Sequence, residues 1–148
     1  MDTARSSSQA VLALAGRVLM AAVFIAGAIG KLDAPAATVR YIASAGLPAP
    51  LVGFVGSMLL ELSCGLLLIF GYRTRTAAMA LAAYCVITAL LFHHSFVDHN
   101  QAIHFMKNLA MAGGLLAFAG YGASAFSIDH LLSHSSARSA YARYPAAR

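Results

Sequence analysis

The sequence has few charged residues. Only 10% of its 148 residues are Asp, Glu, Lys or Arg, whereas a soluble domain carries about 25%. Hydrophobic residues make up 60% of the chain, which is more than one small core can bury because a short chain has a high ratio of surface to volume. The composition excludes an ordinary soluble domain and indicates a protein surrounded by lipid.

Cysteine and the motifs of bound redox centres are also scarce. Cys64 and Cys85 are the two cysteines and do not form a C-x-x-C pair, so we interpret them as small buried thiols rather than a catalytic dithiol. The sequence has no haem, flavin or iron–sulfur cluster motif. Its formal charge of +5 comes from basic residues that flank apolar segments, which argues against nucleic acid as a partner.

Long apolar runs are what the sequence has instead. They cover about residues 11–30, 51–70, 76–92 and 105–123. Each run is close to the ~20 residues that a helix needs to cross a bilayer, and none alternates as the strands of a β-barrel do. The sequence therefore predicts an all-α integral membrane protein, a bundle of four transmembrane helices. We expect one membrane domain over residues 1–132 and a disordered cytoplasmic tail over 133–148.

The segments between the runs predict how the helices follow one another. Pro35 is typical of a first helical position and Gly46 of the residue after a helix end, so we expect a short interfacial helix over residues 35–45. The link GYRTRT between the second and third runs is only a few residues long. This length makes those two spans antiparallel neighbours.

The distribution of Lys and Arg predicts the orientation. With the N-terminus inside, the inner side holds Arg5, Arg73, Arg75, Arg138, Arg143 and Arg148, and the outer side holds Lys31, Arg40 and Lys107. Inner loops of membrane proteins carry the excess of Lys and Arg. We therefore expect both termini in the cytoplasm. Arg17 interrupts the first apolar run, which favours an uncleaved span over a signal peptide.

Glu61 is the acidic residue at the middle of the second span. A carboxylate at that depth costs about 2.5 kcal/mol or more, so it needs a partner. Arg17 has a similar predicted depth, and we predict an Arg17–Glu61 pair that either fixes the helix register or borders a ligand site. Lys107 and Asn108, at the start of the fourth span, complete this candidate intramembrane polar site.

A second group of polar residues is expected on the outer face of the membrane. It comprises Lys31, His93, His94 and His104. Histidine clusters can bind metal ions, but this spacing matches no known metal site. We interpret these side chains as interfacial polar groups and assign no metal.

Several segments together carry a family resemblance. They are Arg17, FIAGAIGKL ending at Lys31, Tyr41, GLPAP at 46–50, Glu61, FGYRTR at 70–75, the doublet His93-His94, HFMKNLAMAGGLL at 104–116 and the segment ending at Asp129. In this order the sequence resembles the DoxX family of small four-span bacterial inner-membrane proteins, over about residues 10–132. The segment from Lys107 to the double glycine is the most specific part of the resemblance.

The resemblance implies an inner-membrane location more firmly than a reaction. Some relatives are linked to thiosulfate:quinone oxidoreductase, and others to membrane complexes that handle thiol and oxidative stress. The hypothesis is thus an accessory or quinone-interacting subunit of a membrane redox system, with quinone as the compatible cofactor. Expected partners are the lipid bilayer and either other redox subunits or a second copy. The isolated chain is not expected to be an enzyme, and no catalytic residue is assigned. A small-molecule transport or permeability protein and a non-catalytic scaffold are the alternatives.

Overall fold

The computed structural model describes residues 2–143, and the side chains of residues 7–135. This part of the chain forms six helices joined by short links. They are α1 (Asp2–Asp33), α2 (Pro35–Ser44), α3 (Pro50–Phe70), α4 (Thr74–Phe92), α5 (His99–Tyr121) and α6 (Ile128–Arg143). Helices α1, α3, α4 and α5 are long and apolar enough to cross a membrane. The predicted all-α fold, with a short helix between the first two spans, is confirmed.

Local signals in the sequence set the helix ends. Pro35 and Pro50 begin α2 and α3, where the missing N–H of proline costs no hydrogen bond. Gly71 ends α3 in a left-handed conformation with a φ of 64°, which glycine adopts without a side-chain clash. Asp98 caps α5 by accepting a hydrogen bond from the N–H of Asn100 at 2.9 Å. This cap makes α5 begin six residues earlier than the predicted start at residue 105.

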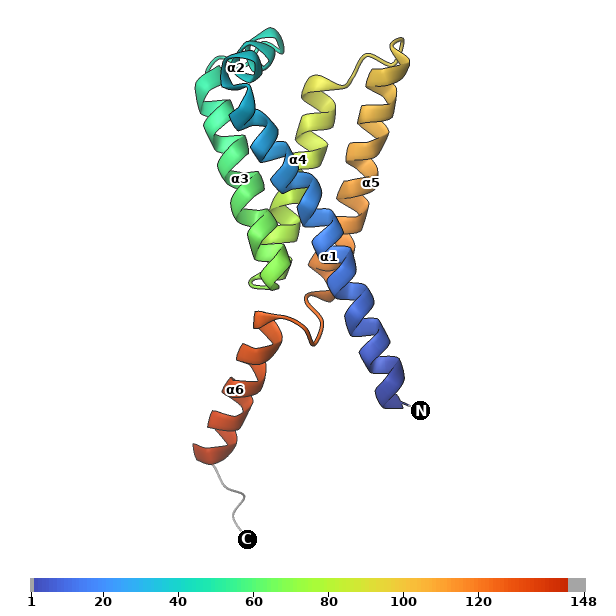
Figure 1. The fold of residues 1–148 in the computed structure, drawn as a ribbon, viewed down its shortest axis with the longest axis vertical. Coiled ribbons are helices and arrows are strands. Elements are labelled where there is room, and N and C mark those ends of the chain that lie inside the picture. Colours follow the sequence, from blue (N-terminus) through green and yellow to red (C-terminus); the bar gives the residue numbers. More distant parts are fainter. Residues whose placement is uncertain (1, 144–148) are drawn as a thin grey trace.

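The four spans form two antiparallel pairs. Helix α1 packs mainly against α3, and α4 packs mainly against α5, while α3 and α4 join the pairs. Figure 1 shows the pairs diverging toward the end of the molecule that carries α2 and the α4–α5 link. At the opposite end the pairs come together, and α6 projects away from them (Figure 1). We call these the α2 end and the α6 end.

The packed core occupies the half of the bundle nearer the α6 end. Its largest buried apolar side chains are Leu68, Leu81 and Leu115, each with no exposed surface. They come from α3, α4 and α5, and small residues such as Ala78 and Ala112 let the helices approach closely. Because this half is tightly packed, the space between the two helix pairs lies in the diverging half.

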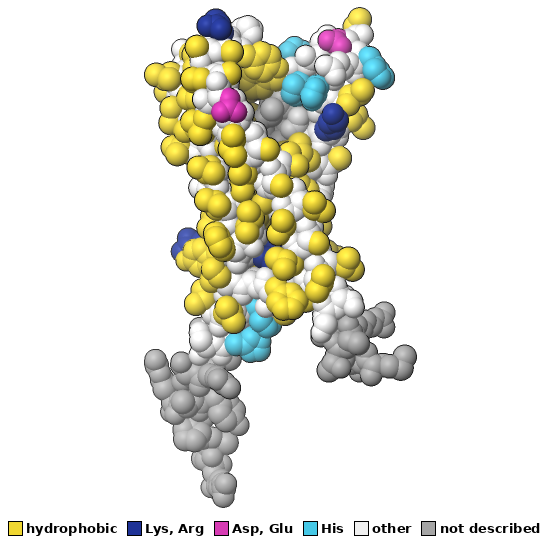
Figure 2. All heavy atoms as spheres, in the orientation of Figure 1, with side chains coloured by type: hydrophobic (Ala, Val, Ile, Leu, Met, Phe, Trp, Pro, Cys, Tyr) yellow, Lys and Arg dark blue, Asp and Glu magenta, His cyan; other side chains and the backbone are white. Residues whose placement is uncertain are grey.

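The outer surface of the bundle is that of a membrane protein. Large apolar side chains such as Leu19, Val52 and Met106 are more than half exposed, and a bilayer would bury them. Figure 2 shows a broad band of hydrophobic side chains across the middle of the visible face, with charged and histidine side chains gathered toward the ends of the molecule. The same view shows a recess between the two helix pairs at the α2 end.

The C-terminal segment differs from the expected disordered tail over residues 133–148. It continues as α6 through Arg143, and residues 144–148 lie outside the described part. The helix starts at a local cap, because the buried Ser127 accepts a hydrogen bond from the N–H of His130 at 3.2 Å. Asp129 adds a negative charge in the first turn, where a helix favours it.

Candidate functional site

The diverging half of the bundle encloses a cavity of about 400 Å³. Apolar side chains from α1, α2, α3, α4 and α5 line most of its wall; among them are Val23, Phe24, Ile42, Leu47, Ile87, Leu91, Phe92 and Met111. A few polar groups also face it, namely Lys31, Thr38, Tyr41, Ser57, Glu61, Tyr84, Thr88, His93 and Asn108. An apolar cavity with a few convergent polar groups is the usual form of a small-molecule site.

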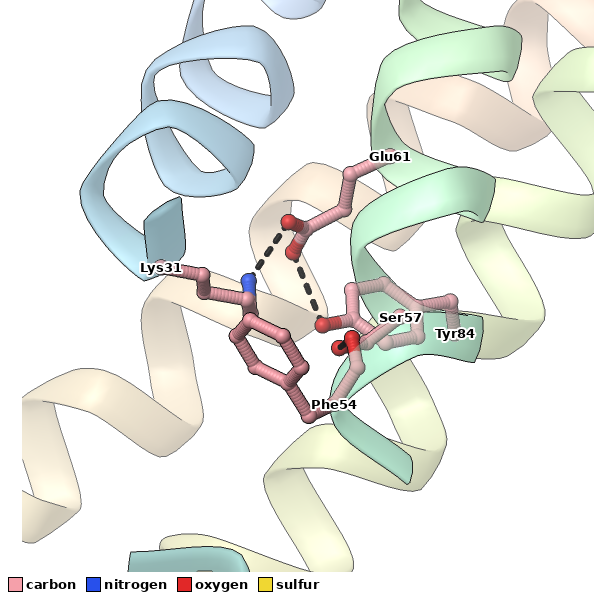
Figure 3. Close-up of polar contacts among 5 residues, drawn as sticks. All are labelled: Lys31, Phe54, Ser57, Glu61 and Tyr84. Carbon is pink, nitrogen blue, oxygen red and sulfur yellow. Dashed lines mark hydrogen bonds and ion pairs between the residues drawn. The ribbon is translucent and has the colours of Figure 1, made fainter. Parts of the chain in front are cut away.

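Three side chains form a polar array deep in this cavity. Lys31 Nζ lies 2.5 Å from Glu61 Oε2, and the hydroxyl of Tyr84 donates a hydrogen bond to Glu61 Oε1 at 2.8 Å. Figure 3 shows Lys31 and Tyr84 approaching the carboxylate from α1 and α4, with Ser57 beside the tyrosine hydroxyl. Both oxygens of the buried carboxylate therefore have a partner, which reduces the cost of placing Glu61 inside the membrane.

The position of the array follows from the packing of α1 on α3. Gly27 on α1 lies directly over the Glu61 carboxylate, because a Cβ on this glycine would be 3.4 Å from Oε2. Lys31 is one helical turn further along α1, so its side chain reaches the same carboxylate. Counted from Pro50, Glu61 lies about 16 Å along α3 from its start. The array is therefore near the middle of the span.

Aromatic and histidine side chains surround the mouth of the cavity. Tyr41 on α2 stacks on Phe92 at the end of α4, with ring centroids 5.3 Å apart. This contact joins the two helix pairs at the α2 end. His93 stacks on His104 with centroids 5.0 Å apart, and its Nδ1 lies 2.7 Å from the Gln101 side-chain oxygen.

The predicted pairing of Arg17 with Glu61 is wrong. Arg17 is fully buried at the α6 end, where its guanidinium donates to the carbonyl oxygens of Leu68, at 3.4 Å, and Phe126. Since α1 and α3 run antiparallel, the glycine that faces Arg17 is Gly71, ten residues beyond Glu61. The separation is about 15 Å along the helix, which even an arginine side chain does not span.

The other predicted site residues divide between the cavity and the surface. Asn108 lines the cavity, and its amide donates to the His104 carbonyl at 3.0 Å. Lys107 and His94 are exposed and are not among the residues that line the cavity. Residues of both predicted clusters therefore line one cavity, namely Lys31, Glu61, His93 and Asn108.

The sequence analysis missed several site residues, of which Tyr84 and Tyr41 make the principal contacts. The phenol of Tyr84 lies within an apolar span, and a buried tyrosine hydroxyl usually needs a hydrogen-bond partner. That requirement was the available signal for a contact with Glu61. Tyr41 was quoted only as part of the family pattern, and nothing in its local sequence places its ring against Phe92.

A separate polar network closes the α6 end. Asp129 accepts hydrogen bonds from the N–H groups of Arg73 at 2.8 Å and Thr74 at 2.9 Å, and so caps α4 from another helix. Its own N–H donates to the carbonyl of Gly71 at 2.9 Å. Burial alone would raise the pKa of Asp129, but these hydrogen bonds and the nearby charge of Arg17 outweigh it and lower the pKa.

These features define a four-span helical membrane protein with an intramembrane polar array in an apolar cavity. The DoxX family model matches residues 12–94, and the chain belongs to this family. The match ends before the 104–116 segment on which the resemblance relied most.

Two relatives match most of the chain. It is 40% identical over 119 residues to Inner membrane protein YqjF of Escherichia coli (strain K12), a match covering 80% of this chain and 90% of the relative. It is 30% identical over 128 residues to Inner membrane protein YphA of the same organism, covering 83% and 91%. No solved structure matches. Both relatives are named as inner-membrane proteins, in agreement with the four apolar spans.

Proposed function

We propose that the cavity binds a small, mostly apolar molecule with a polar head, of the quinone class, and that the protein is an accessory or quinone-interacting subunit of a membrane redox system. The observation that carries this proposal is the Lys31–Glu61–Tyr84 array facing an apolar cavity of about 400 Å³. That volume lies within the usual range for small-molecule sites. The packed core beyond it favours a binding site over a continuous transport pathway.

Lys31 in this array has N–H donors that can bind the polar head of such a molecule. An ammonium has three N–H donors, and the Glu61 carboxylate accepts from Lys31 Nζ. A quinone carbonyl can accept another of them. The apolar walls from α1 and α4 would hold the ring and the start of an isoprenoid chain. The chain supplies binding and orientation in this proposal, while electrons come from a partner subunit, because the sequence has no C-x-x-C pair or redox-centre motif.

The proposed location is the inner membrane of a bacterium with both termini in the cytoplasm. The α6 end carries the inner connection with Arg73 and Arg75, whereas the α2 end carries Lys31, Arg40 and Lys107. Arg5 and Arg138, in the terminal segments on the same side as Arg73 and Arg75, bring the count there to four against three, and this excess of Lys and Arg on the inner side supports the orientation. The cavity then lies in the outer half of the bilayer, near the periplasmic surface.

Binding of a short-chain ubiquinone to the purified protein tests the proposal. We expect the ligand to raise the melting temperature of the wild-type protein in detergent, because it binds only the folded state. Equilibrium dialysis should give about tenfold weaker binding for Lys31→Met, since it loses a polar contact worth about 1.5 kcal/mol. Tyr84→Phe should weaken binding less, since its hydroxyl donates to Glu61 and acts on the ligand only by positioning the Lys31–Glu61 pair. Lys107→Met and Tyr72→Phe, at residues outside the cavity lining, should bind as the wild type does.

Two results would contradict the proposal. The first is equal binding by the cavity variants and their controls, and the second is no binding by a wild-type protein that is folded by circular dichroism. The role in a redox system has its own test, which is gentle-detergent purification followed by identification of co-purified proteins and lipids. If neither a redox subunit nor a quinone co-purifies, the result favours a non-catalytic scaffold and contradicts the proposed redox role.

A further inference from the structure

The α6 end contains a second pocket, which the proposed quinone site does not use. Its volume is about 390 Å³, and its lining includes Arg73, Arg75, Gly122, Asp129 and His130. These residues come from the α3–α4 link, the first turn of α4, the end of α5 and the start of α6. Two parts of the chain far apart in sequence, residues 73–76 and 121–133, thus converge on one polar pocket where the membrane spans end.

The charges in this pocket favour an anion. Arg73 and Arg75 are exposed and carry two positive charges. Asp129 carries one negative charge, but both of its oxygens already accept hydrogen bonds from the N–H groups of Arg73 and Thr74. The buried Arg17 adds a further positive charge nearby. The balance in and around the pocket is positive even with His130 neutral.

Donors of the right geometry are available at the pocket. The first hydrogen bond within α4 runs from the N–H of Ala77 to the carbonyl of Arg73. The N–H groups of Arg75 and Thr76 precede it and have no acceptor within the helix. The Arg75 guanidinium lies against the backbone of Gly122, since a Cβ there would be 3.1 Å from its Nε. A guanidinium fork beside free helix N–H groups suits the oxygens of a phosphate.

The surroundings place this pocket at the level of lipid head groups. Tyr121 at the end of α5 is 89% exposed, and Tyr72 at the end of α3 is partly exposed. Tyrosines at the ends of spans are typical of the membrane–water interface. The Arg73 guanidinium lies over the Tyr72 ring, 5.9 Å from its centroid. The pocket therefore opens where the phosphates of a bilayer lie.

We propose that this pocket binds the phosphate group of an anionic phospholipid, with Arg73 and Arg75 as the principal ligands. Basic pockets between transmembrane helices bind such head groups in other membrane proteins. The phosphodiester would accept from both guanidinium groups and from the first turn of α4, while the acyl chains would lie along the apolar faces of α3 and α5. This site is independent of the quinone proposal and lies at the other end of the bundle.

The test is lipid binding to the detergent-solubilised full chain, measured by native mass spectrometry with added phosphatidylglycerol. We expect the wild-type protein to retain phosphatidylglycerol over phosphatidylcholine, and Arg73→Gln/Arg75→Gln to lose about tenfold in that retention. Arg40→Gln, which removes an exposed charge at the α2 end, should stay within about twofold of the wild type. Equal retention by the double variant, or no preference between the lipids, would overturn the proposal.

Two further measurements keep the test decisive. Arg73 has a left-handed backbone, so Arg75→Gln alone serves if the double variant fails to fold by circular dichroism, and it should lose about fivefold. Inorganic phosphate in excess should neither raise the melting temperature nor displace the lipid. If phosphate alone does both in the wild type and not in Arg75→Gln, the ligand is a free phosphate, and the lipid assignment is wrong.

Discussion

Glu61 has two partners that differ in their access to water. Lys31 is near one end of α1 and its side chain is 19% exposed, whereas the side chain of Glu61 is 6% exposed. A lysine that loses its partner can extend toward the interface. A glutamate at mid-span cannot do so and must be neutralised or held by Tyr84 alone. Removing Lys31 should therefore destabilise the protein more than removing the charge of Glu61.

The first prediction follows from that asymmetry. Lys31→Met should destabilise the protein by about 3 kcal/mol, because it leaves a buried carboxylate without its counter-charge. Glu61→Gln should cost less, about 1–2 kcal/mol, because Lys31 can reach water. The double variant should be more stable than Lys31→Met. Reversible unfolding in detergent, followed by circular dichroism, measures all three, and strictly additive losses would show that the two charges do not interact.

Gly71 is a position where no side chain fits. Its φ is 64°, and a Cβ would overlap the Arg17 guanidinium and the Ser127 side chain. Gly46 has a similar φ of 81° with no atom within 4 Å of its Cβ position. The two glycines share the backbone conformation and differ in their surroundings. Substitutions at these two positions therefore separate the free-energy cost of a left-handed backbone from the cost of a steric clash.

The second prediction compares alanine at these two glycines. Gly46→Ala should cost about 1 kcal/mol, the usual penalty for a left-handed alanine. Gly71→Ala should cost about 3 kcal/mol, because the added methyl group also displaces Arg17 from its carbonyl partners. Melting temperatures of the two variants in the same detergent measure the difference. Equal losses would mean that Arg17 is not held against Gly71.

Residue-scale contacts were only partly predictable from the sequence. The prediction that Glu61 has a partner was correct, because a mid-span carboxylate requires one in any bundle. The choice of Arg17 failed because depths were counted from the edges of apolar runs. In the structure, close packing at Gly27 and Gly71 sets the stagger of α1 against α3, and no local pattern encodes that stagger.

At the scale of elements, α6 is joined to the bundle through Asp129. This carboxylate caps α4, and its own N–H donates to Gly71, so one residue links the end of α3, the start of α4 and the start of α6. The start and end of the short helix α2 were predicted from Pro35 and Gly46 alone. A cap that comes from another helix depends on the tertiary fold and leaves no local signal.

The third prediction concerns the pH dependence of this cap. The pKa of Asp129 is lowered in the folded state, so its contribution to stability is present above the ordinary pKa of 3.8 and is lost as the pH falls through the lowered value. Asp129→Asn should cost about 1 kcal/mol at pH 7, because each carboxylate oxygen accepts from one N–H group, and the NH2 group that replaces one oxygen cannot accept. Melting temperatures between about pH 7 and 3 should show the wild type converging on the variant at the acid end. A constant difference over that range would contradict the assignment.

At the scale of the whole molecule, the bundle has one packed half and one open half. The composition and the apolar runs predicted a four-helix membrane protein, because such runs can be buried in few other ways. The cavity was not predictable, since it results from the divergence of two helix pairs and from the contact of Tyr41 with Phe92. Four polar residues assigned to two separate clusters, Lys31, Glu61, His93 and Asn108, meet in this cavity for the same reason.

The last prediction fixes which half faces the periplasm. Val97, in the α4–α5 link, is 100% exposed, and Tyr121, at the α6 end, is 89% exposed, so a cysteine at either position is accessible. The native Cys64 and Cys85 lie within spans, and the wild-type protein gives their background labelling. A maleimide that crosses the outer but not the inner membrane should label Val97→Cys in intact cells. It should label Tyr121→Cys only after the inner membrane is permeabilised, because the positive-inside rule predicts that the α6 end lies in the cytoplasm. The reverse pattern would place the cavity in the inner half of the bilayer and the arginine pocket outside. It would therefore reverse the side from which each proposed ligand enters.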